Sequence, residues 1–181
     1  MKGLVFRSYL QFVEDNFGIE AVEQMIDQSK LPSNAAYSNV GTYSHDEILT
    51  MVGVLCNMKG LNPTDAVKLF GYDLFNKLAI AHKDMVAQCD NPCDFLDALD
   101  NIIHREVKKL YSNAELPSIG VKINEGKHIV LEYESSRPFA DLAHGLIQSC
   151  FDHYQKKCEI EKQDLPPNDG TKAIFNISVL D

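Results

Sequence analysis

The spacing of apolar residues changes near residue 112, and this change limits the chain to a fold that combines helices with a sheet. Before that point, Val5, Tyr9 and Phe12 recur at the intervals expected for one face of a helix. After it, apolar residues between positions 119 and 133 alternate with polar ones, as on a half-buried strand. A purely helical fold and a purely β fold are therefore both excluded.

Residues that start or end helices bound the apolar stretches of the first part. Gly18 is placed to end the first helix, and Ser44 and Glu47 have the spacing of a capping box. Pro63 suits a first helical position, and Asn91 with its following proline precedes the last stretch. We therefore expect helices over residues 4–17, 21–26, 44–59, 63–78 and 93–110.

Four strand-like stretches and one long helical stretch follow residue 112. Strands are expected over 119–123 and 129–133, around residue 159, and over 173–179, with a helix over 139–154. This order predicts an α+β protein, in which a helical amino-terminal subdomain packs on a β-β-α-β-β part with a four-stranded antiparallel sheet. The length of 181 residues fits a single domain, which we expect to consist of a helical subdomain over 1–60 and a helix-and-sheet part over 61–181.

Seventeen basic and twenty-six acidic residues give the chain a net charge of −9. This balance argues against nucleic acid and against an anionic membrane as partners, because both require a basic face. The sequence has no run of about 18 apolar residues and no secretory leader. The five cysteines form no C-x-x-C pair, which favours free thiols in a reducing compartment. We therefore expect a soluble cytoplasmic protein.

The sequence contains none of the short motifs that mark hydrolases, kinases, nucleotide-binding sites or zinc proteases. It offers no arrangement of nucleophile and base either, so we expect no enzymatic activity. Cys150 and His153 lie three residues apart on one expected helix, as two metal ligands can. However, Cys150 belongs to the apolar face of that helix and is better explained as a buried side chain.

His104 lies at the edge of the apolar face of the expected helix 93–110. At about 100° per residue, that face centres on Leu99, Ile103 and Val107, and His104 lies roughly 90° from its centre. An imidazole at such an edge is either half-buried beside a cleft or solvated. The helix by itself favours a solvated histidine.

Tyr133, Ser135 and Arg137 lie two residues apart in an extended stretch, so their side chains share one face. Two hydroxyls and a guanidinium on one face suit a carboxylate, which arginine binds in a planar, two-point manner. By itself the pattern also fits a polar strand end that leads into the helix after Pro138.

Together, these two features resemble the heme nitric oxide/oxygen-binding (H-NOX) domains, a family related to the heme domain of soluble guanylate cyclase. The Tyr-x-Ser-x-Arg motif of that family is complete at residues 133–137, and His104 lies about thirty residues upstream, where the family has its proximal heme ligand. Met1-Lys2-Gly3 and Leu116-Pro117 also match. The resemblance covers essentially the whole chain and implies a bacterial stand-alone sensor with heme between its two parts.

The resemblance implies heme b as the cofactor and assigns a role to each matching residue. His104 would ligate the iron, and Tyr133, Ser135 and Arg137 would hold the heme propionates. Pro117 would press on a pyrrole ring and distort the macrocycle.

The gas that such a domain binds depends on the distal side of the heme. Oxygen-binding members place a tyrosine five residues after the arginine of the motif, and this chain has Leu142 there. The other residues assigned to the heme pocket are also apolar: Val5, Leu74, Leu78 and Leu146. Because none of them donates a hydrogen bond, we expect binding of NO, tolerance of CO and exclusion of O₂. The alternative is an oxygen-binding sensor that uses the Tyr9 hydroxyl as its donor.

The family also implies a signalling route. NO weakens or breaks the bond between the iron and His104, which releases the helix that carries His104 and shifts the two parts against each other. The signal then passes to an effector protein, which for bacterial stand-alone members is a histidine kinase or a cyclic-di-GMP enzyme.

Two other interpretations stay open. A non-heme interaction module would take an apolar ligand such as a lipid in the same cleft and would show no heme absorption. A thiol redox switch would use Cys89 and Cys93, which lie four residues apart. Replacing these cysteines by serine would then abolish signalling, whereas His104→Gly would not.

Overall fold

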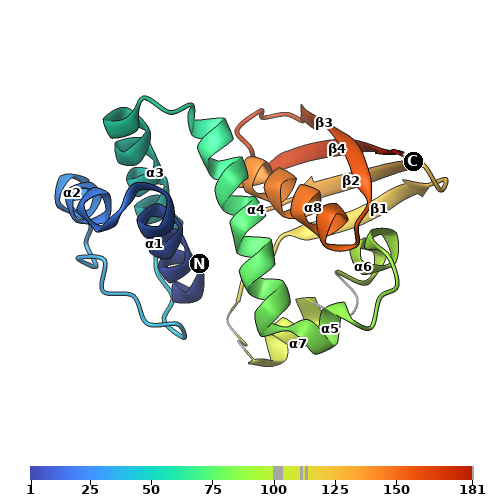
Figure 1. Cartoon of the computed structure of the whole chain (residues 1–181), viewed down its shortest axis with the longest axis horizontal. Coiled ribbons are helices and arrows are strands. Elements are labelled where there is room, and N and C mark those ends of the chain that lie inside the picture. Colours follow the sequence, from blue (N-terminus) through green and yellow to red (C-terminus); the bar gives the residue numbers. More distant parts are fainter. Residues whose placement is uncertain (100–103, 111, 113, 181) are drawn as a thin grey trace. The chain divides into compact units, whose positions relative to one another are not determined.

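Helices form the described chain up to Leu110, and the strands follow it, as the change of spacing predicts (Figure 1). The computed structural model describes residues 1–99, 104–110, 112 and 114–180, and only the backbone of residues 106, 107 and 110. Two compact units, Met1–Phe70 and Gly71–Asp181, divide within helix α4. The helices before the sheet are α1 (Gly3–Phe17), α2 (Ile19–Ser29), α3 (His45–Lys59), α4 (Pro63–Ala81), α5 (Lys83–Val86), α6 (Pro92–Ala98) and α7 (His104–Leu110).

Capping residues set the helix boundaries where the sequence predicts them. Gly18 has a φ of +82°, which suits glycine, and its N–H donates to the Glu14 carbonyl at the end of α1. The Ser44 side chain caps the beginning of α3, and the Asn91 side chain caps the beginning of α6. These expected boundaries are confirmed.

The Glu47 carboxylate does not take the place that the capping box assigns to it. It is buried and accepts hydrogen bonds from the hydroxyls of Ser33 and Tyr37, the second at 2.8 Å. Glu47 thereby ties the connection between α2 and α3 to the first turn of α3. A buried carboxylate requires strong donors, and the two hydroxyls supply them.

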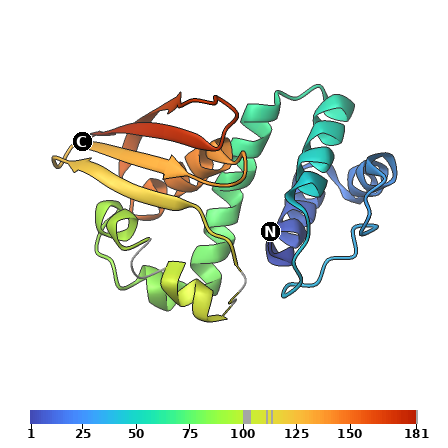
Figure 2. The ribbon, with the colours of Figure 1, turned by 180° about the vertical axis from the view of Figure 1, so that it is seen from behind.

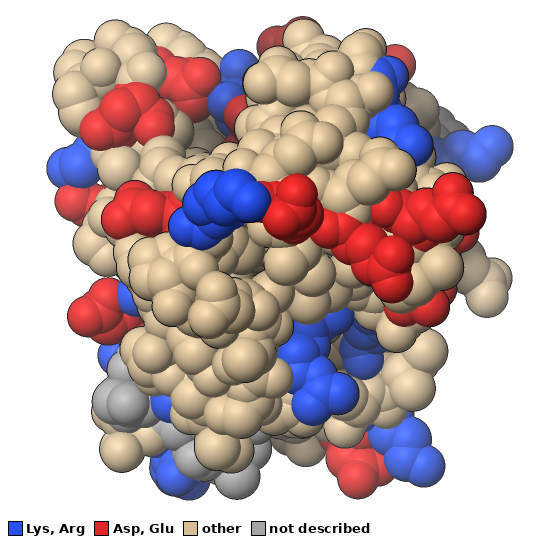
Figure 3. All heavy atoms as spheres, turned by 90° about the vertical axis from the view of Figure 1, so that its left-hand side faces the viewer, with Lys and Arg blue, Asp and Glu red and all other residues tan. Residues whose placement is uncertain are grey.

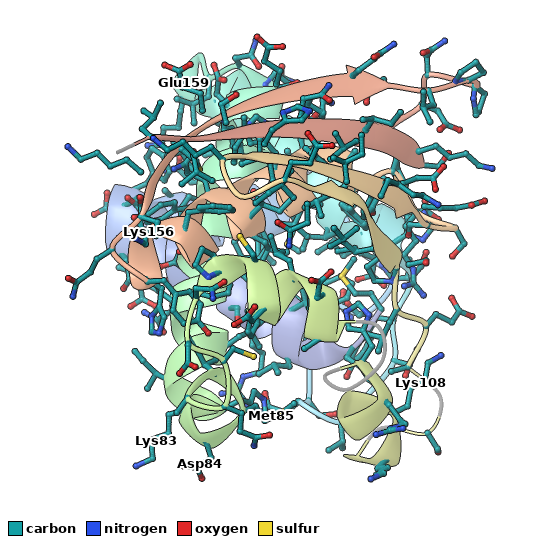
Figure 4. All side chains as sticks on the ribbon, turned by 90° about the vertical axis from the view of Figure 1, so that its right-hand side faces the viewer. Lys83, Asp84, Met85, Lys108, Lys156 and Glu159 are labelled. Carbon is teal, nitrogen blue, oxygen red and sulfur yellow. The ribbon has the colours of Figure 1, made fainter. Side chains whose placement is uncertain are left out.

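The helix expected over 93–110 is described in two parts, α6 and α7. Residues 100–103 of this expected helix lie outside the described residues, and they include Ile103, which was expected on the apolar face. The side chain of Val107 lies outside the described residues as well. Helix α5 has no counterpart among the expected elements, because four residues are too few to show a helical period. In Figure 4 the labelled Lys83 and Asp84 of α5 point away from the ribbon.

The sheet is antiparallel, with the strand order β1-β2-β4-β3. Its elements are β1 (Ser118–Asn124), β2 (His128–Glu134), β3 (Lys157–Asp164) and β4 (Lys172–Leu180), and helix α8 (Ala140–His153) lies between β2 and β3 in the sequence. On the central strand β2, Tyr133 is paired with Ile119 of β1 and Ala173 of β4. The expected β-β-α-β-β order and the α+β class are confirmed.

One face of the sheet is buried under α8 and α6 (Figure 2). The shared core is apolar and consists of Leu96, Ile119, Ile129, Leu131, Tyr133, Ala140, Ala143, Ile147, Phe151, Ala173, Phe175 and Ile177. The opposite face carries ion pairs, such as Lys172 with Glu134 at 2.7 Å. The side of β2 that carries Tyr133 is therefore the side that faces the core.

Replacing Glu47 by alanine should destabilise the unit Met1–Phe70. The change leaves two hydroxyls without their acceptor, so we expect the free energy of unfolding to fall by about 2–4 kcal/mol. Chemical denaturation measures it. Glu23→Ala, at an exposed position of α2, is the control and should cost no more than about 0.5 kcal/mol. Equal losses in the two variants would show that the carboxylate does not anchor the connection.

Candidate functional site

Tyr133, Ser135 and Arg137 come together at the end of β2. The Ser135 N–H donates to the Thr171 carbonyl at 2.9 Å, so the extended backbone continues past the strand as far as Ser135. The backbone then bends at residues 136–138, so the extended stretch expected through Arg137 is wrong at its end. The Ser135 hydroxyl accepts a hydrogen bond from the Arg137 N–H at 3.1 Å. Burial raises the pKa of Tyr133, while the hydrogen bond with Ser135 and the charge of Arg137 partly offset this rise. Ser135 therefore contacts both the Tyr133 phenol and the backbone of Arg137, and the charge of Arg137 acts on the Tyr133 phenol.

The Arg137 guanidinium already binds a carboxylate. Its side chain is 13% exposed, and its Nη2 forms an ion pair with the Glu115 carboxylate. Its Nη1 donates to the Glu115 backbone carbonyl at 2.8 Å. A largely buried guanidinium that pairs with a carboxylate, with its charge acting on the Tyr133 phenol, fits the chemistry of a heme propionate, which is also a carboxylate on an otherwise apolar body.

His104 and Pro117 lie on either side of the point where the helices give way to the sheet. His104 lies in α7, and its side chain is half-buried. Pro117 is half-buried in the irregular segment 114–117, directly before β1. Partial burial is compatible with the roles expected for both residues.

Four of the apolar residues assigned to the heme pocket lie on α4 and α8 in the unit Gly71–Asp181. Leu74 is buried, and Leu78, Leu142 and Leu146 are half-buried. The two helices approach each other closely, because a Cβ on Gly71 would lie 2.2 Å from the Leu142 carbonyl oxygen. The structure thus places these leucines on two helices in direct backbone contact.

Val5 and Tyr9 belong to α1 in the unit Met1–Phe70. Val5 is half-buried, whereas Tyr9 is only 2% exposed and packs edge-on against Phe70, with ring centroids 5.0 Å apart. The Tyr9 hydroxyl has no hydrogen-bond partner in the described part of the chain. Burial raises its pKa, so this hydroxyl is a neutral donor.

The thiols near the connection between α5 and α6 are poor nucleophiles. Burial, together with neighbouring aspartates, raises the pKa of both Cys89 and Cys93. Because the thiolate is the reactive form, this weakens the case for a redox switch. Within residues 1–99, 104–110, 112 and 114–180, no group of three or more His, Cys, Asp or Glu side chains is arranged to hold a metal ion.

The pairing of Glu115 with Arg137 has no signal in the sequence. Glu115 lies in an irregular segment 22 residues before Arg137, where no period or motif marks it.

Elsewhere on the surface, acidic side chains lie beside basic ones on the face that Figure 3 displays. None of the described helices is both long enough and apolar enough to cross a membrane.

A family model and several solved structures each match nearly the whole chain. A family model described as haem-NO-binding matches residues 2–162. The unliganded Fe(II) H-NOX protein from K. algicida is 31% identical, with a TM-score of 0.94 over 100% of this chain and 97% of that chain. The S. oneidensis H-NOX protein in the Fe(II)NO state is 26% identical, with a TM-score of 0.91 over 100% of both chains. The IWP-051-bound H-NOX from Shewanella woodyi in the Fe(II)CO state is 34% identical, with a TM-score of 0.82 over 98% of this chain and 94% of that chain. No curated protein matches the chain at a significant level.

The raised pKa of Tyr133 predicts a loss of stability in alkali. The stabilising contribution is complete below about pH 10, where the phenol of the unfolded chain ionises, and it is lost as the pH rises through the higher pKa of the folded protein. Tyr133→Phe removes the ionising group, so its unfolding free energy should fall less steeply than that of the wild type above that pH.

Tyr43→Phe is the matched control for this measurement. Hydrogen bonding at Ser38 lowers the pKa of Tyr43, so removing this phenol should make the alkaline decline steeper. Denaturation curves between about pH 9 and 11 measure both slopes. A shallower slope in both variants would contradict the assignment.

Proposed function

The chain belongs to the haem-NO-binding (H-NOX) family of heme-binding gas-sensor domains, and we propose that this member detects nitric oxide at a five-coordinate ferrous heme b. The convergence of Tyr133, Ser135 and Arg137 carries the proposal, because these side chains form a site whose guanidinium already binds a carboxylate. A relative from S. oneidensis has been solved in the Fe(II)NO state and one from Shewanella woodyi in the Fe(II)CO state.

Each residue of the proposed site has one physical task. Arg137, Ser135 and Tyr133 hold the propionates and so fix the rotation of the macrocycle. His104 would supply a nitrogen ligand to the iron, and Pro117 would pack against the macrocycle. When bound, the heme supplies the iron that coordinates the gas.

Apolar side chains explain the proposed choice of gas. The residues that the family resemblance assigns to the pocket would offer no donor to a bound diatomic ligand: Val5, Leu74, Leu78, Leu142 and Leu146. Bound O₂ depends on such a donor far more than NO or CO does. The side chains therefore favour NO, tolerate CO and exclude O₂.

The proposed signal leaves the chain through His104 and α7. Release of His104 from a bound heme would free α7, the helix that carries it, and such a helix is an element that a ligand can bias between two positions. We place no enzymatic step in this chain, so the output falls to an effector. A histidine kinase or a cyclic-di-GMP enzyme is the proposed effector.

Absorption spectra of the reduced protein test the proposed function. We expect a Soret band, a shift on addition of NO to the spectrum of a five-coordinate nitrosyl, and no stable complex in air. His104→Gly should bind NO with the same final spectrum, because the histidine is already released in the wild type. A nitrosyl spectrum that stays six-coordinate would contradict the release of His104. Absence of any Soret band after expression with heme would favour an apolar-ligand module instead.

Oxygen sensing is the second candidate function, and the Tyr9 hydroxyl is the observation that favours it. A buried hydroxyl without a partner costs about 1–3 kcal/mol, and an acceptor brought by a ligand would remove that cost. Bound O₂ is such an acceptor.

Tyr9→Phe separates the two candidates. If the protein is selective for NO, the variant forms no oxygen complex, keeps its NO spectrum and gains about 1–3 kcal/mol of unfolding free energy, because an unpaired hydroxyl is gone. Phe12→Leu, at a buried position in the same helix, controls for changes in packing. An oxygen complex that forms in the wild type and disappears in Tyr9→Phe would establish oxygen sensing.

A further inference from the structure

Arg137 holds Glu115 at two points. Nη1 donates to the backbone carbonyl of Glu115 at 2.8 Å, and Nη2 pairs with its carboxylate. The two acceptors belong to one residue but to different chemical groups. The guanidinium is therefore fixed to a stretch of backbone as well as to a side chain.

The backbone contact is the stronger part of this attachment. The Glu115 side chain is 72% exposed, so the ion pair by itself is weak and screened by salt. The Arg137 side chain is 13% exposed, and a hydrogen bond from a charged donor to a carbonyl is stronger than one between neutral groups. Glu115 thus adds a second, weaker contact that orients the guanidinium on the carbonyl.

The position of Glu115 gives the contact its significance. Glu115 lies in the irregular segment 114–117, two residues before Pro117 and directly before β1. At the other end, Arg137 follows Ser135, whose N–H is bonded to Thr171 and so extends the pairing of the sheet. Arg137 therefore ties a segment without secondary structure to the sheet, the rigid element of this unit.

Donors remain for a second carboxylate. An arginine side chain presents five N–H donors in a planar fork. Glu115 accepts one hydrogen bond from Nη1 and one from Nη2, so the other N–H groups are not used by Glu115. The same guanidinium can therefore bind a propionate while it holds Glu115. One side chain then determines both the position of the propionate and the position of the segment before Pro117.

We propose that Glu115 and Arg137 form one positioning unit, which couples the propionate site to the Pro117 segment. Glu115 is a positioning residue in this unit, since it acts through Arg137 and through the backbone. The coupling to heme rests on the proposed function, whereas the tie between Glu115 and Arg137 is a property of the chain alone.

Hydrogen–deuterium exchange at the amides of residues 115, 116 and 118 tests the tie on the protein as purified. Glu115→Ala should raise exchange by about threefold, and Arg137→Gln by about tenfold, because only the second removes the contact to the carbonyl. Glu115→Gln keeps an acceptor and should stay near the wild type. Glu125→Ala, at an exposed position of the turn between β1 and β2, is the control for loss of one negative charge.

A double variant decides whether the two residues act as one unit. Glu115→Ala combined with Arg137→Gln should exchange no faster than Arg137→Gln alone. Effects that multiply, or exchange in Glu115→Ala that equals the wild type, would overturn the proposal. These readouts need no heme, so they remain decisive even if the absorption spectra refute the proposed function.

Transfer of heme to apomyoglobin tests the coupling. Glu115→Ala should release heme about threefold faster than the wild type, with Glu115→Gln restoring the slower rate. Slower release from Glu115→Ala would overturn the proposal, because it would show that Glu115 competes with the propionate for Arg137. An unchanged release rate would likewise refute the coupling.

Discussion

The pairing of β2 with β4 is the constraint on which the candidate site depends. It places Tyr133 opposite Ala173 in the sheet, and it continues past the strand ends through the hydrogen bond from Ser135 to Thr171. The N–H of Ala140 donates to the carbonyl of the neighbouring Gly170 at 3.0 Å, so the same connection also fixes the beginning of α8. A shift of one residue in the pairing register of β2 with β4 would turn Tyr133 away from the core and separate the side chains of the candidate site.

Three buried polar groups of this chain differ in how their hydrogen bonds are satisfied. Glu47 is buried but satisfied by two hydroxyls, so it holds a connection in place. Tyr133 is buried beside Ser135 and Arg137, and its polar neighbours gather at one end of the sheet. Tyr9 has a buried hydroxyl without a partner in the described residues, which is why it defines the second candidate function.

The sequence predicted what depends on local pattern, and it missed what depends on contacts between distant segments. Period and capping residues were sufficient for the long helices and the order of the strands. The Tyr-x-Ser-x-Arg motif was expected to lie on one strand face, but β2 ends at Glu134 and the backbone bends at residues 136–138. Helix α5 was too short to show a period. The burial of Glu47 was missed because its donors come from the preceding connection. Glu115 was missed because an isolated acidic residue 22 positions from Arg137 carries no pattern.

The central claim is that the side chains at the end of β2 hold the propionates of a heme, and the most direct test compares heme with its dimethyl ester. Esterification removes the charge of both propionates and leaves the macrocycle intact. The account predicts that the wild type binds heme at least about tenfold more tightly than the ester, and that Arg137→Gln removes most of this preference. Equal affinities for the two compounds in the wild type would contradict it.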